Sequence, residues 1–319
     1  MRAAFSDALV AAARADPRVL LLTGDHGYAL FDAFRKACPR QYINCGVAEQ
    51  NMVGVAAGLA KGGFRPVVYG LAAFVPVRVL EQIKVDVCYE RLPVMFIGDG
   101  AGFVYSHLGS SHQSTEDIAC ARSLPALAVL SPADRFELTA AFRLAFALAS
   151  PAYLRLGKSD RGDVHPGPVS LSVGEMLKVR GGSGKGALIA TGSMVRTALE
   201  IVDGGLDADV WSVPTIKPID LRVLGGICRQ ADWLVVLEEH SVIGGLGACV
   251  AEAVTSTRPV PVCRIGVEDR FSEFCGTYEY LLREHRLDAE SVKRRINDFL
   301  DSVGTFSHDT GHVRSGISR

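Results

Sequence analysis

The sequence predicts an α/β protein with two domains, each built on a mainly parallel sheet that helices cover. Short runs of leucine and β-branched residues alternate along the chain with longer stretches of helical spacing. This order is typical of parallel strands that are joined by helices. The chain has 319 residues, of which 48% are hydrophobic, and this length suits two domains with ordinary cores.

The elements of the first domain, 1–160, follow in order. Residues 1–18 predict an amphipathic helix and not a secretory signal, because Asp7, Arg14 and Asp16 interrupt the apolar residues. Apolar runs predict the strands, and helical spacing predicts the helices between them. The strands are expected at 19–22, 66–69, 93–97, 127–130 and 152–156, and helices at 49–60 and 133–149.

A second alternation begins after a break in the pattern. Residues 161–186 are rich in glycine, proline and charge, and predict a linker. Strands at 187–190, 209–213, 233–238 and 260–265 are then expected in a second domain, 187–302. From 303 to 319 the sequence is polar and without pattern, which predicts a flexible tail. His308 and His312 in this tail are not expected to bind a metal.

Composition excludes several function classes. The chain has 34 Lys and Arg against 35 Asp and Glu, so charge gives no reason to expect nucleic acid or a membrane surface as a partner. No stretch approaches the ~18–20 consecutive apolar residues of a membrane span. The eight cysteines form no CxxC pair, so reduced and buried thiols are expected, not metal ligands. We therefore expect a cytoplasmic protein with no metal ligands of its own.

The first motif that carries chemistry contains Glu49. Its place near the first turn of the helix suits the helix dipole without any function. The surrounding GVAEQNMVGVAAGLAKGGFRPVV, 46–68, closely resembles the pyrimidine-binding domain of transketolases and 1-deoxyxylulose-5-phosphate synthases, which use thiamine diphosphate. In that family a glutamate hydrogen-bonds a ring nitrogen of the cofactor's aminopyrimidine. The resemblance gives this catalytic and cofactor-binding role to Glu49, since a carboxylate can share a proton with a buried ring nitrogen.

A second motif, GLAAFVPVR at 70–78, follows the strand at 66–69. The family reads close to S-T-F-x-x-F here and stacks an aromatic face on the aminopyrimidine. The resemblance places Phe74 at the second aromatic and Leu71 at the first, which implies a pocket of different shape. Core packing is the alternative for Phe74. The resemblance also implies that Gln82 contacts the cofactor.

The third motif is YSHLGSSHQSTEDI at 105–118. The hydroxyls at 114–115 indicate a helix start without any function. Transketolases carry G-x-D-G-P-T-H-Q here, and the resemblance places His112 at the histidine that lines the substrate channel. The family's acid falls on Leu108, which implies a different donor or stereochemistry, because leucine cannot satisfy a buried hydroxyl. His107 is either a solvated loop residue or another channel group.

Two further strand ends carry candidate groups. Asp25 and His26 follow the strand at 19–22, where the family has an acid close to the cofactor and the substrate entrance. Arg155 lies in the last strand of the first domain, where the family's arginine can meet a sugar phosphate in a bidentate contact. An ion pair at the strand end is the alternative for Arg155.

The second half resembles the transketolase C-terminal domain, in 187–193, 235–247 and 266–271. The resemblance therefore covers two of the three domains of a complete transketolase. The third domain binds the diphosphate through Mg²⁺, with a G-D-G that is followed later by Asn. Gly98-Asp99-Gly100 matches that start, but no asparagine occurs between Asn51 and Asn297. We interpret the G-D-G as a turn.

The resemblance thus implies a split enzyme. This chain would be the C-terminal (beta) subunit, and a separate N-terminal subunit would carry the diphosphate and Mg²⁺ domain. The cofactor would lie at the interface of an α2β2 heterotetramer, and a two-carbon ketol unit would pass from a sugar or sugar phosphate to an aldehyde. Alternatives are the beta subunit of a 2-oxo acid dehydrogenase, a 1-deoxyxylulose-5-phosphate synthase-like enzyme, and a non-catalytic scaffold paralogue. The GSSHQ loop weighs against the dehydrogenase, and the retention of Glu49, Phe74 and His112 weighs against the scaffold.

Overall fold

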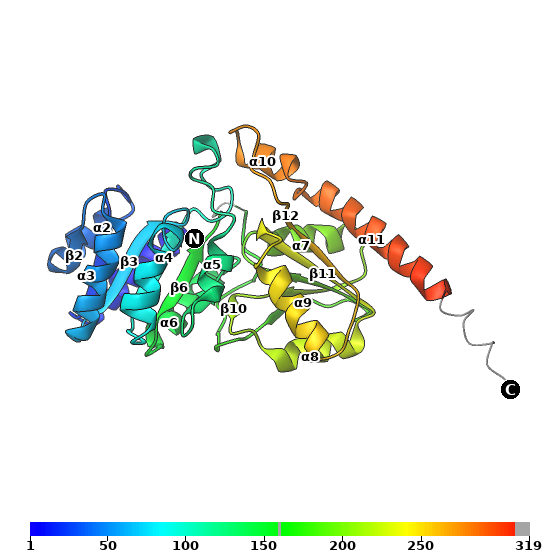
Figure 1. Ribbon diagram of the computed structural model, residues 1–319, viewed down its shortest axis with the longest axis horizontal. Coiled ribbons are helices and arrows are strands. Elements are labelled where there is room, and N and C mark those ends of the chain that lie inside the picture. Colours follow the sequence, from blue (N-terminus) through cyan, green and yellow to red (C-terminus); the bar gives the residue numbers. More distant parts are fainter. Residues whose placement is uncertain (159–160, 310–319) are drawn as a thin grey trace.

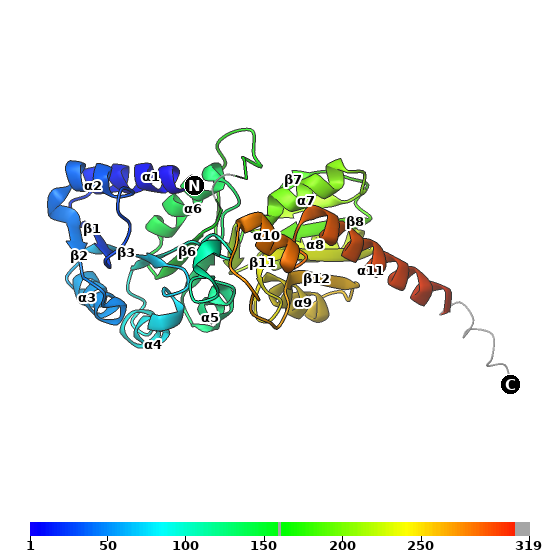
Figure 2. The ribbon, with the colours of Figure 1, turned by 90° about the horizontal axis from the view of Figure 1, so that it is seen from above.

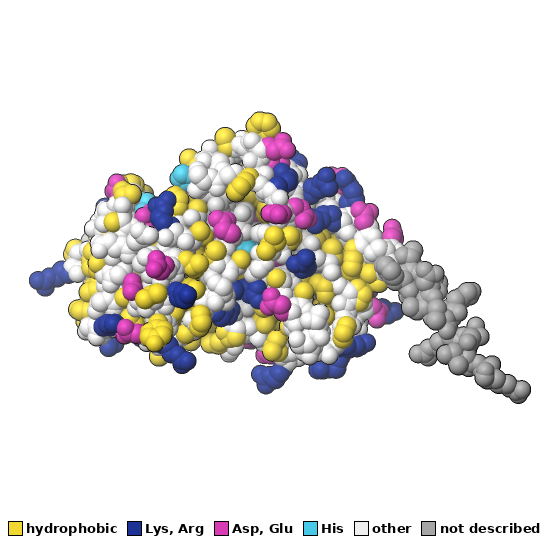
Figure 3. Space-filling view, in the orientation of Figure 1, with side chains coloured by type: hydrophobic (Ala, Val, Ile, Leu, Met, Phe, Trp, Pro, Cys, Tyr) yellow, Lys and Arg dark blue, Asp and Glu magenta, His cyan; other side chains and the backbone are white. Residues whose placement is uncertain are grey.

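The structure is a computed structural model that describes residues 1–158 and 161–309. Two α/β lobes lie side by side, and helix α11 (Ala289–Asp309) extends away from the second lobe (Figure 1). On the face shown in Figure 3, cations and carboxylates are interspersed, as the nearly balanced charge of the sequence predicts. Among the described residues, no helix is both long and apolar enough to cross a membrane.

The first lobe is a sheet of seven strands that is parallel except at one edge. Helices cover both faces, with α1 (Arg2–Ala15), α2 (Asp32–Ala37) and α6 (Arg135–Ala147) on one and α3 (Glu49–Lys61), α4 (Leu80–Gln82) and α5 (Asp117–Ser123) on the other (Figure 2). The order along the sheet is β10 (Thr215–Lys217), β5 (Ala128–Leu130), β6 (Ala152–Leu156), β4 (Met95–Asp99), β3 (Arg65–Leu71), β1 (Val19–Thr23) and β2 (Tyr42–Asn44).

Successive side chains along a strand point to opposite faces of this sheet. In β1, Leu20 and Leu22 pack into the cluster under α3, whereas Val19 and Leu21 pack into the cluster under α1 and α6. Both faces are buried, so the strand reads as a continuous apolar run, as is typical of parallel sheets covered on both sides. Helix α6 begins where the sequence provides a cap: the carboxylate of Asp134 accepts hydrogen bonds from the N–H groups of Phe136 and Glu137.

The second lobe repeats this construction with a sheet of five strands. Their order is β12 (Val262–Val267), β11 (Trp233–Ser241), β8 (Gly186–Ala190), β9 (Asp209–Ser212) and β7 (Leu177–Arg180), and only β7 is antiparallel. Helices α7 (Met194–Asp203), α10 (Tyr278–Glu284) and α11 pack into one cluster. Helices α8 (Leu221–Gln230) and α9 (Leu246–Ser256) pack into another, which they share with α3 and α5 of the first lobe. The two lobes therefore have one apolar core in common.

Several elements differ from the sequence-based expectation. Strands β2 and β10 have three residues each, too few for a periodic pattern, and β7 lies within the expected linker 161–186. Helix α11 extends to Asp309, beyond the end expected for the second domain at 302, and the flexibility of the tail stays a prediction. Val292 and Ile296, one helical turn apart and fully buried, fix this helix on the core. Residues 310–319, with His312, lie outside the described residues.

The remaining expectations for the fold are confirmed. The N-terminal helix is α1, which buries Phe5, Leu9 and Ala13 on one face. Each strand expected from the sequence occurs, with ends that differ by three residues or fewer. All eight cysteines are free, and Cys275 alone among them is exposed. Four of them are buried, as small apolar side chains are: Cys38, Cys88, Cys228 and Cys249.

Candidate functional site

The candidate residues gather where four neighbouring strands end. Strands β4, β3, β1 and β2 are adjacent and parallel. Asp25 and His26 follow β1, Glu49 follows β2, Phe74 follows β3, and His112 lies in the loop after β4. Since the carboxyl ends of parallel strands meet at one edge, these residues lie at the edge where open α/β sheets usually bind their ligands.

Glu49 is the first residue of α3 and is only 8% exposed. The helix start favours a negative charge at this position. Its Oε1 accepts a hydrogen bond of 2.9 Å from Nη1 of Arg78, which lies in the short helix Val77–Val79 after β3. The carboxylate is thus a buried anion with a single charged partner.

Arg78 connects Glu49 to the other two central candidates. Its guanidinium carbon lies 3.9 Å from the centroid of the Phe74 ring, so the cation covers one aromatic face. The ring of His112 meets Phe74 edge-on, with centroids 5.5 Å apart. Glu49, Phe74 and His112 are therefore brought together, as expected, through a residue that the sequence reasoning did not single out. The only signal for Arg78 is its place four residues after Phe74.

The loop that carries His112 is fixed at its base. Gly102 and Ser114 form an antiparallel bridge in which each N–H donates to the other's carbonyl, over 2.8 and 2.9 Å. Gly102 has φ +62° and its backbone approaches Glu239 so closely that a Cβ would lie 2.2 Å from the carboxylate. The second lobe also holds this loop, because Ser272 donates to Oε1 of Gln113. His112 itself is half-buried, with Nδ1 3.0 Å from the hydroxyl of Ser111.

His26 adds a polar atom with no partner to the same edge of the sheet. Its ring stacks on Tyr69 with centroids 5.5 Å apart. Burial lowers the pKa of His26, and the carboxylate of Glu49 acts in the opposite direction. Among the described residues, Nε2 of His26 and Oε1 of Gln82 are buried without a hydrogen-bond partner. Both atoms are therefore available to a hydrogen-bonding group of a ligand.

Other candidates lie at the margin of this group. Asp25 is exposed and accepts a hydrogen bond of 2.6 Å from Tyr28. His107 and Leu108 are exposed on the short helix Ser106–Leu108. Leu71 is half-buried and pairs with Asp99 in the register of β3 and β4. Among the described residues, Asp25, His107 and Leu108 have no hydrogen bond, ion pair or ring contact with Glu49, Phe74 or His112, whereas the carbonyl of Leu71 accepts a hydrogen bond of 2.8 Å from the N–H of Phe74.

Arg155 lies away from the group and is 4% exposed. Its Nε donates to Asp117, and its Nη2 donates to the carbonyls of Ser114 and Glu239. These contacts leave the guanidinium covered by protein, so the structure has the ion pair that was the alternative to a phosphate ligand. Arg155 supports the base of the His112 loop through Ser114.

The G-D-G sequence also has a structural explanation. Asp99 ends β4 and is 2% exposed. Its carboxylate accepts hydrogen bonds from Arg2, Tyr69 and Tyr105 over 2.7–3.1 Å. The carboxylate is therefore engaged with α1 and with the loop after β4. Among the described residues, no group of three or more His, Cys, Asp or Glu side chains could hold a metal ion.

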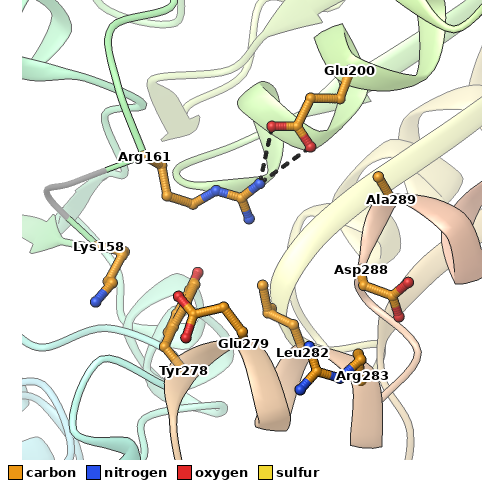
Figure 4. A pocket seen from close by; sticks show the side chains of 9 residues that line it. All are labelled: Lys158, Arg161, Glu200, Tyr278, Glu279, Leu282, Arg283, Asp288 and Ala289. Carbon is orange, nitrogen blue, oxygen red and sulfur yellow. Dashed lines mark hydrogen bonds and ion pairs between the residues drawn. The ribbon is translucent and has the colours of Figure 1, made fainter.

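A cavity of about 420 Å³ lies elsewhere, beside α7 and α10 of the second lobe (Figure 4). Cations and carboxylates alternate around it, and Arg161 and Glu200 face each other across it at 3.5 Å. Its lining is Lys158, Arg161, Glu200, Tyr278, Glu279, Leu282, Arg283, Asp288 and Ala289. None of the candidate site residues is among them, so the cavity is separate from the group around Glu49.

Comparison with protein families assigns both lobes. Residues 1–162 match the transketolase pyrimidine binding domain, and residues 174–292 match the transketolase C-terminal domain. The first match ends within a few residues of the expected domain end at 160. The second begins before β7, within the segment expected to be a linker.

Individual relatives align over nearly the whole chain. An apulose-4-phosphate transketolase subunit of Phocaeicola vulgatus is 32% identical over 94% of this chain and 97% of its own. The 6-deoxy-6-sulfo-D-fructose transketolase subunit SqwH of a Clostridium species is 34% identical over 93% of this chain and 94% of its own. A solved split-gene transketolase, described as an inactive beta4 tetramer, superposes with a TM-score of 0.84 at 34% identity, over 94% of this chain and 97% of that chain.

Proposed function

The chain belongs to the transketolase family, and we propose that it is the C-terminal subunit of a split, thiamine-diphosphate-dependent transketolase. The observation that carries this proposal is the contact group at the carboxyl ends of the first sheet, in which Arg78 connects buried Glu49 to Phe74, and Phe74 contacts His112. The proposed reaction is transfer of a two-carbon ketol unit from a ketose, free or phosphorylated, to an aldehyde.

The residues present fit the aminopyrimidine half of the cofactor. Glu49 would hold a proton at a ring nitrogen, and Phe74 would pack on the ring face. His26, which interacts electrostatically with Glu49, has a buried Nε2 without a hydrogen-bond partner among the described residues. When bound, thiamine diphosphate supplies the carbanion chemistry that such a transfer needs. His112, half-buried on a fixed loop, would donate or accept a proton at a substrate oxygen and orient it.

A second subunit completes the proposed site. The one G-D-G of this chain has its carboxylate engaged by three side chains, so we assign the Mg²⁺ and diphosphate ligands to an N-terminal partner subunit. The relatives named as transketolase subunits, which align over nearly their full length, support this division. The solved beta4 tetramer supports it too, since four such subunits together are described as inactive. We propose an α2β2 heterotetramer.

Leu108 gives information about the ketose that donates the two-carbon unit. It lies 55% exposed on the short helix that precedes His112, at the position where the family's acid is expected. A leucine there cannot accept a hydrogen bond from a hydroxyl group of the ketose that donates the two-carbon unit. We therefore propose a donor that differs in substitution or stereochemistry from the usual ketose phosphate. The two relatives act, by their names, on apulose 4-phosphate and on a sulfo-sugar, which supports variation of the donor among such subunits.

The test is reconstitution of this chain with an N-terminal transketolase subunit from the same genome. Glu49→Gln keeps the shape of the side chain but removes the charge, and we expect turnover to fall by at least ~100-fold. Glu81→Gln, on the exposed side of nearby α4, is the matched control and should retain full turnover. Unchanged turnover in Glu49→Gln would refute the catalytic assignment.

Two further arms separate the alternatives. The reconstituted complex is assayed with ketoses and, separately, with 2-oxo acids and an artificial electron acceptor. Activity with 2-oxo acids alone would favour a 2-oxo acid dehydrogenase subunit, and no activity with either class would favour a scaffold. Binding of thiamine diphosphate to this chain alone, with the affinity of the complex, would contradict the proposed division between subunits.

A further inference from the structure

Arg78 lies between Glu49 and Phe74 and contacts both. Its Nη1 lies 2.9 Å from Oε1 of Glu49, and its guanidinium carbon lies 3.9 Å from the centre of the Phe74 ring. The Arg78 side chain is 45% exposed, whereas that of Glu49 is 10% exposed. A long, solvent-accessible cation therefore reaches inward to a buried carboxylate and covers an aromatic face on its way.

These two contacts are those that the proposed function assigns to the aminopyrimidine. A guanidinium is planar, presents N–H donors at its edge and stacks by its face on aromatic rings. A protonated pyrimidine ring is also planar, has an N–H at its edge and stacks by its face. Oε1 of Glu49 and the covered face of Phe74 can serve one such group at a time, so a ring bound at this oxygen and this face would exclude Arg78.

We propose that Arg78 is an internal stand-in for the aminopyrimidine, and that it leaves the pair when the cofactor binds. This inference rests on the proposed function. Before binding, Arg78 keeps the buried carboxylate of Glu49 paired, which matters because an unpaired buried charge is strongly destabilising. It also keeps the Phe74 face covered. Arg78 is thus a positioning residue that holds the ring site in shape and competes with the ring for it.

The competition has a measurable consequence. In Arg78→Met the side chain keeps its length and apolar packing but has neither the charge nor the planar donors. The cofactor no longer has to displace an ion pair and a cation–π contact, so we expect the Kd of the reconstituted complex for thiamine diphosphate to fall about tenfold. Arg78→Lys keeps the charge without the planar face and should give an intermediate Kd.

Arg65→Met is the matched control. Arg65 starts the same strand β3 whose end precedes Phe74, and its guanidinium also covers a phenylalanine, Phe146, at 4.6 Å. It lies at the opposite edge of the sheet, so its replacement should leave the Kd unchanged. The Kd is read from equilibrium dialysis with the reconstituted complex, independently of turnover.

A second readout uses this chain alone and needs no cofactor. Arg78→Met should lower the urea midpoint of unfolding, whereas in a Glu49→Gln background the same replacement should have a much smaller effect, because no buried charge is then left unpaired. An equal or higher Kd in Arg78→Met, or equal destabilisation in both backgrounds, would overturn the role of Arg78. Failure of the wild-type complex to bind thiamine diphosphate would instead overturn the proposed function, and Arg78 with it.

Discussion

The Nε atom of Arg155 donates a hydrogen bond of 2.8 Å to Oδ2 of Asp117, and both side chains are almost completely buried. Burial by itself would raise the pKa of Asp117, but the charge of Arg155, nearby His240 and the hydrogen bonds from Arg155 and Tyr153 together outweigh it and hold the pKa below its usual range. The same guanidinium reaches carbonyls of both lobes, at Ser114 and Glu239. One cation thus ties the base of the His112 loop to the second sheet.

Removal of the negative charge of Asp117 should lower the unfolding free energy markedly. Asp117→Asn keeps the size of the side chain but leaves Arg155 as a buried cation without a counter-charge, and the unfolding free energy should fall by about 3–5 kcal/mol. Asp32→Asn is the control, because Asp32 forms an exposed ion pair with Arg35, and exposed pairs contribute about 0–1 kcal/mol. Urea unfolding of the two variants would show equal losses if the buried pair were unimportant.

A pH dependence of stability follows from Glu238 of β11, whose buried carboxylate lies at the start of α9. Burial raises its pKa to about 7, and hydrogen bonds from the N–H groups of Gly247 and Leu246 act in the opposite direction. The ordinary value is 4.5, so between pH 4.5 and 7 the folded chain binds more protons than the unfolded chain. Its stability contribution is complete below pH 4.5 and is lost as the pH rises through 7.

Comparison with Glu238→Gln isolates this contribution. Nearby His240 has a pKa lowered by burial to about 4, so its own contribution is lost as the pH falls, but it is present in both proteins. The difference in unfolding free energy, wild type minus variant, should become less favourable by up to about 3 kcal/mol from pH 5 to pH 8. Chemical unfolding at several pH values measures it, and a difference independent of pH would contradict the raised pKa.

Asp99 should contribute to the stability of the fold and should not be a ligand of Mg²⁺. Its carboxylate joins Arg2 of α1 to Tyr69 and Tyr105. Asp99→Asn weakens these charge-assisted hydrogen bonds and should lower the unfolding free energy by about 1–3 kcal/mol. In the reconstituted complex, the Mg²⁺ concentration that gives half-maximal activity should not change. A markedly raised Mg²⁺ requirement would identify Asp99 as a metal ligand and remove this interpretation.

The fold was predictable wherever the chain buries a whole strand or a whole helix face. Strand β6 and helix α3 illustrate this, because each is an unbroken pattern of sufficient length. Strands β2, β7 and β10 were missed for a physical reason. Each is a short edge strand whose pairing is decided by a neighbour far away in the sequence, and three or four residues cannot carry a period of two.

The site was predictable as far as motifs extend. Glu49, Phe74 and His112 lie on different loops, yet a resemblance over each motif sufficed to group them. Arg78 and Arg155 show the limit. A sequence does not state which carboxylate an arginine will reach, so Arg155 was an open choice between a phosphate and an ion pair. Its partner Asp117 is 38 residues away and meets it only after the sheet has formed.

Strand β10 belongs by sequence to the second half of the chain but completes the first sheet, antiparallel to β5. Separation of the chain at 161–186 would therefore leave β5 with bare backbone donors and acceptors, an edge prone to aggregation. Exchange of the second half for that of a relative would exchange this edge strand as well. The two halves of the chain therefore cannot be recombined independently, although the sequence pattern indicates two domains.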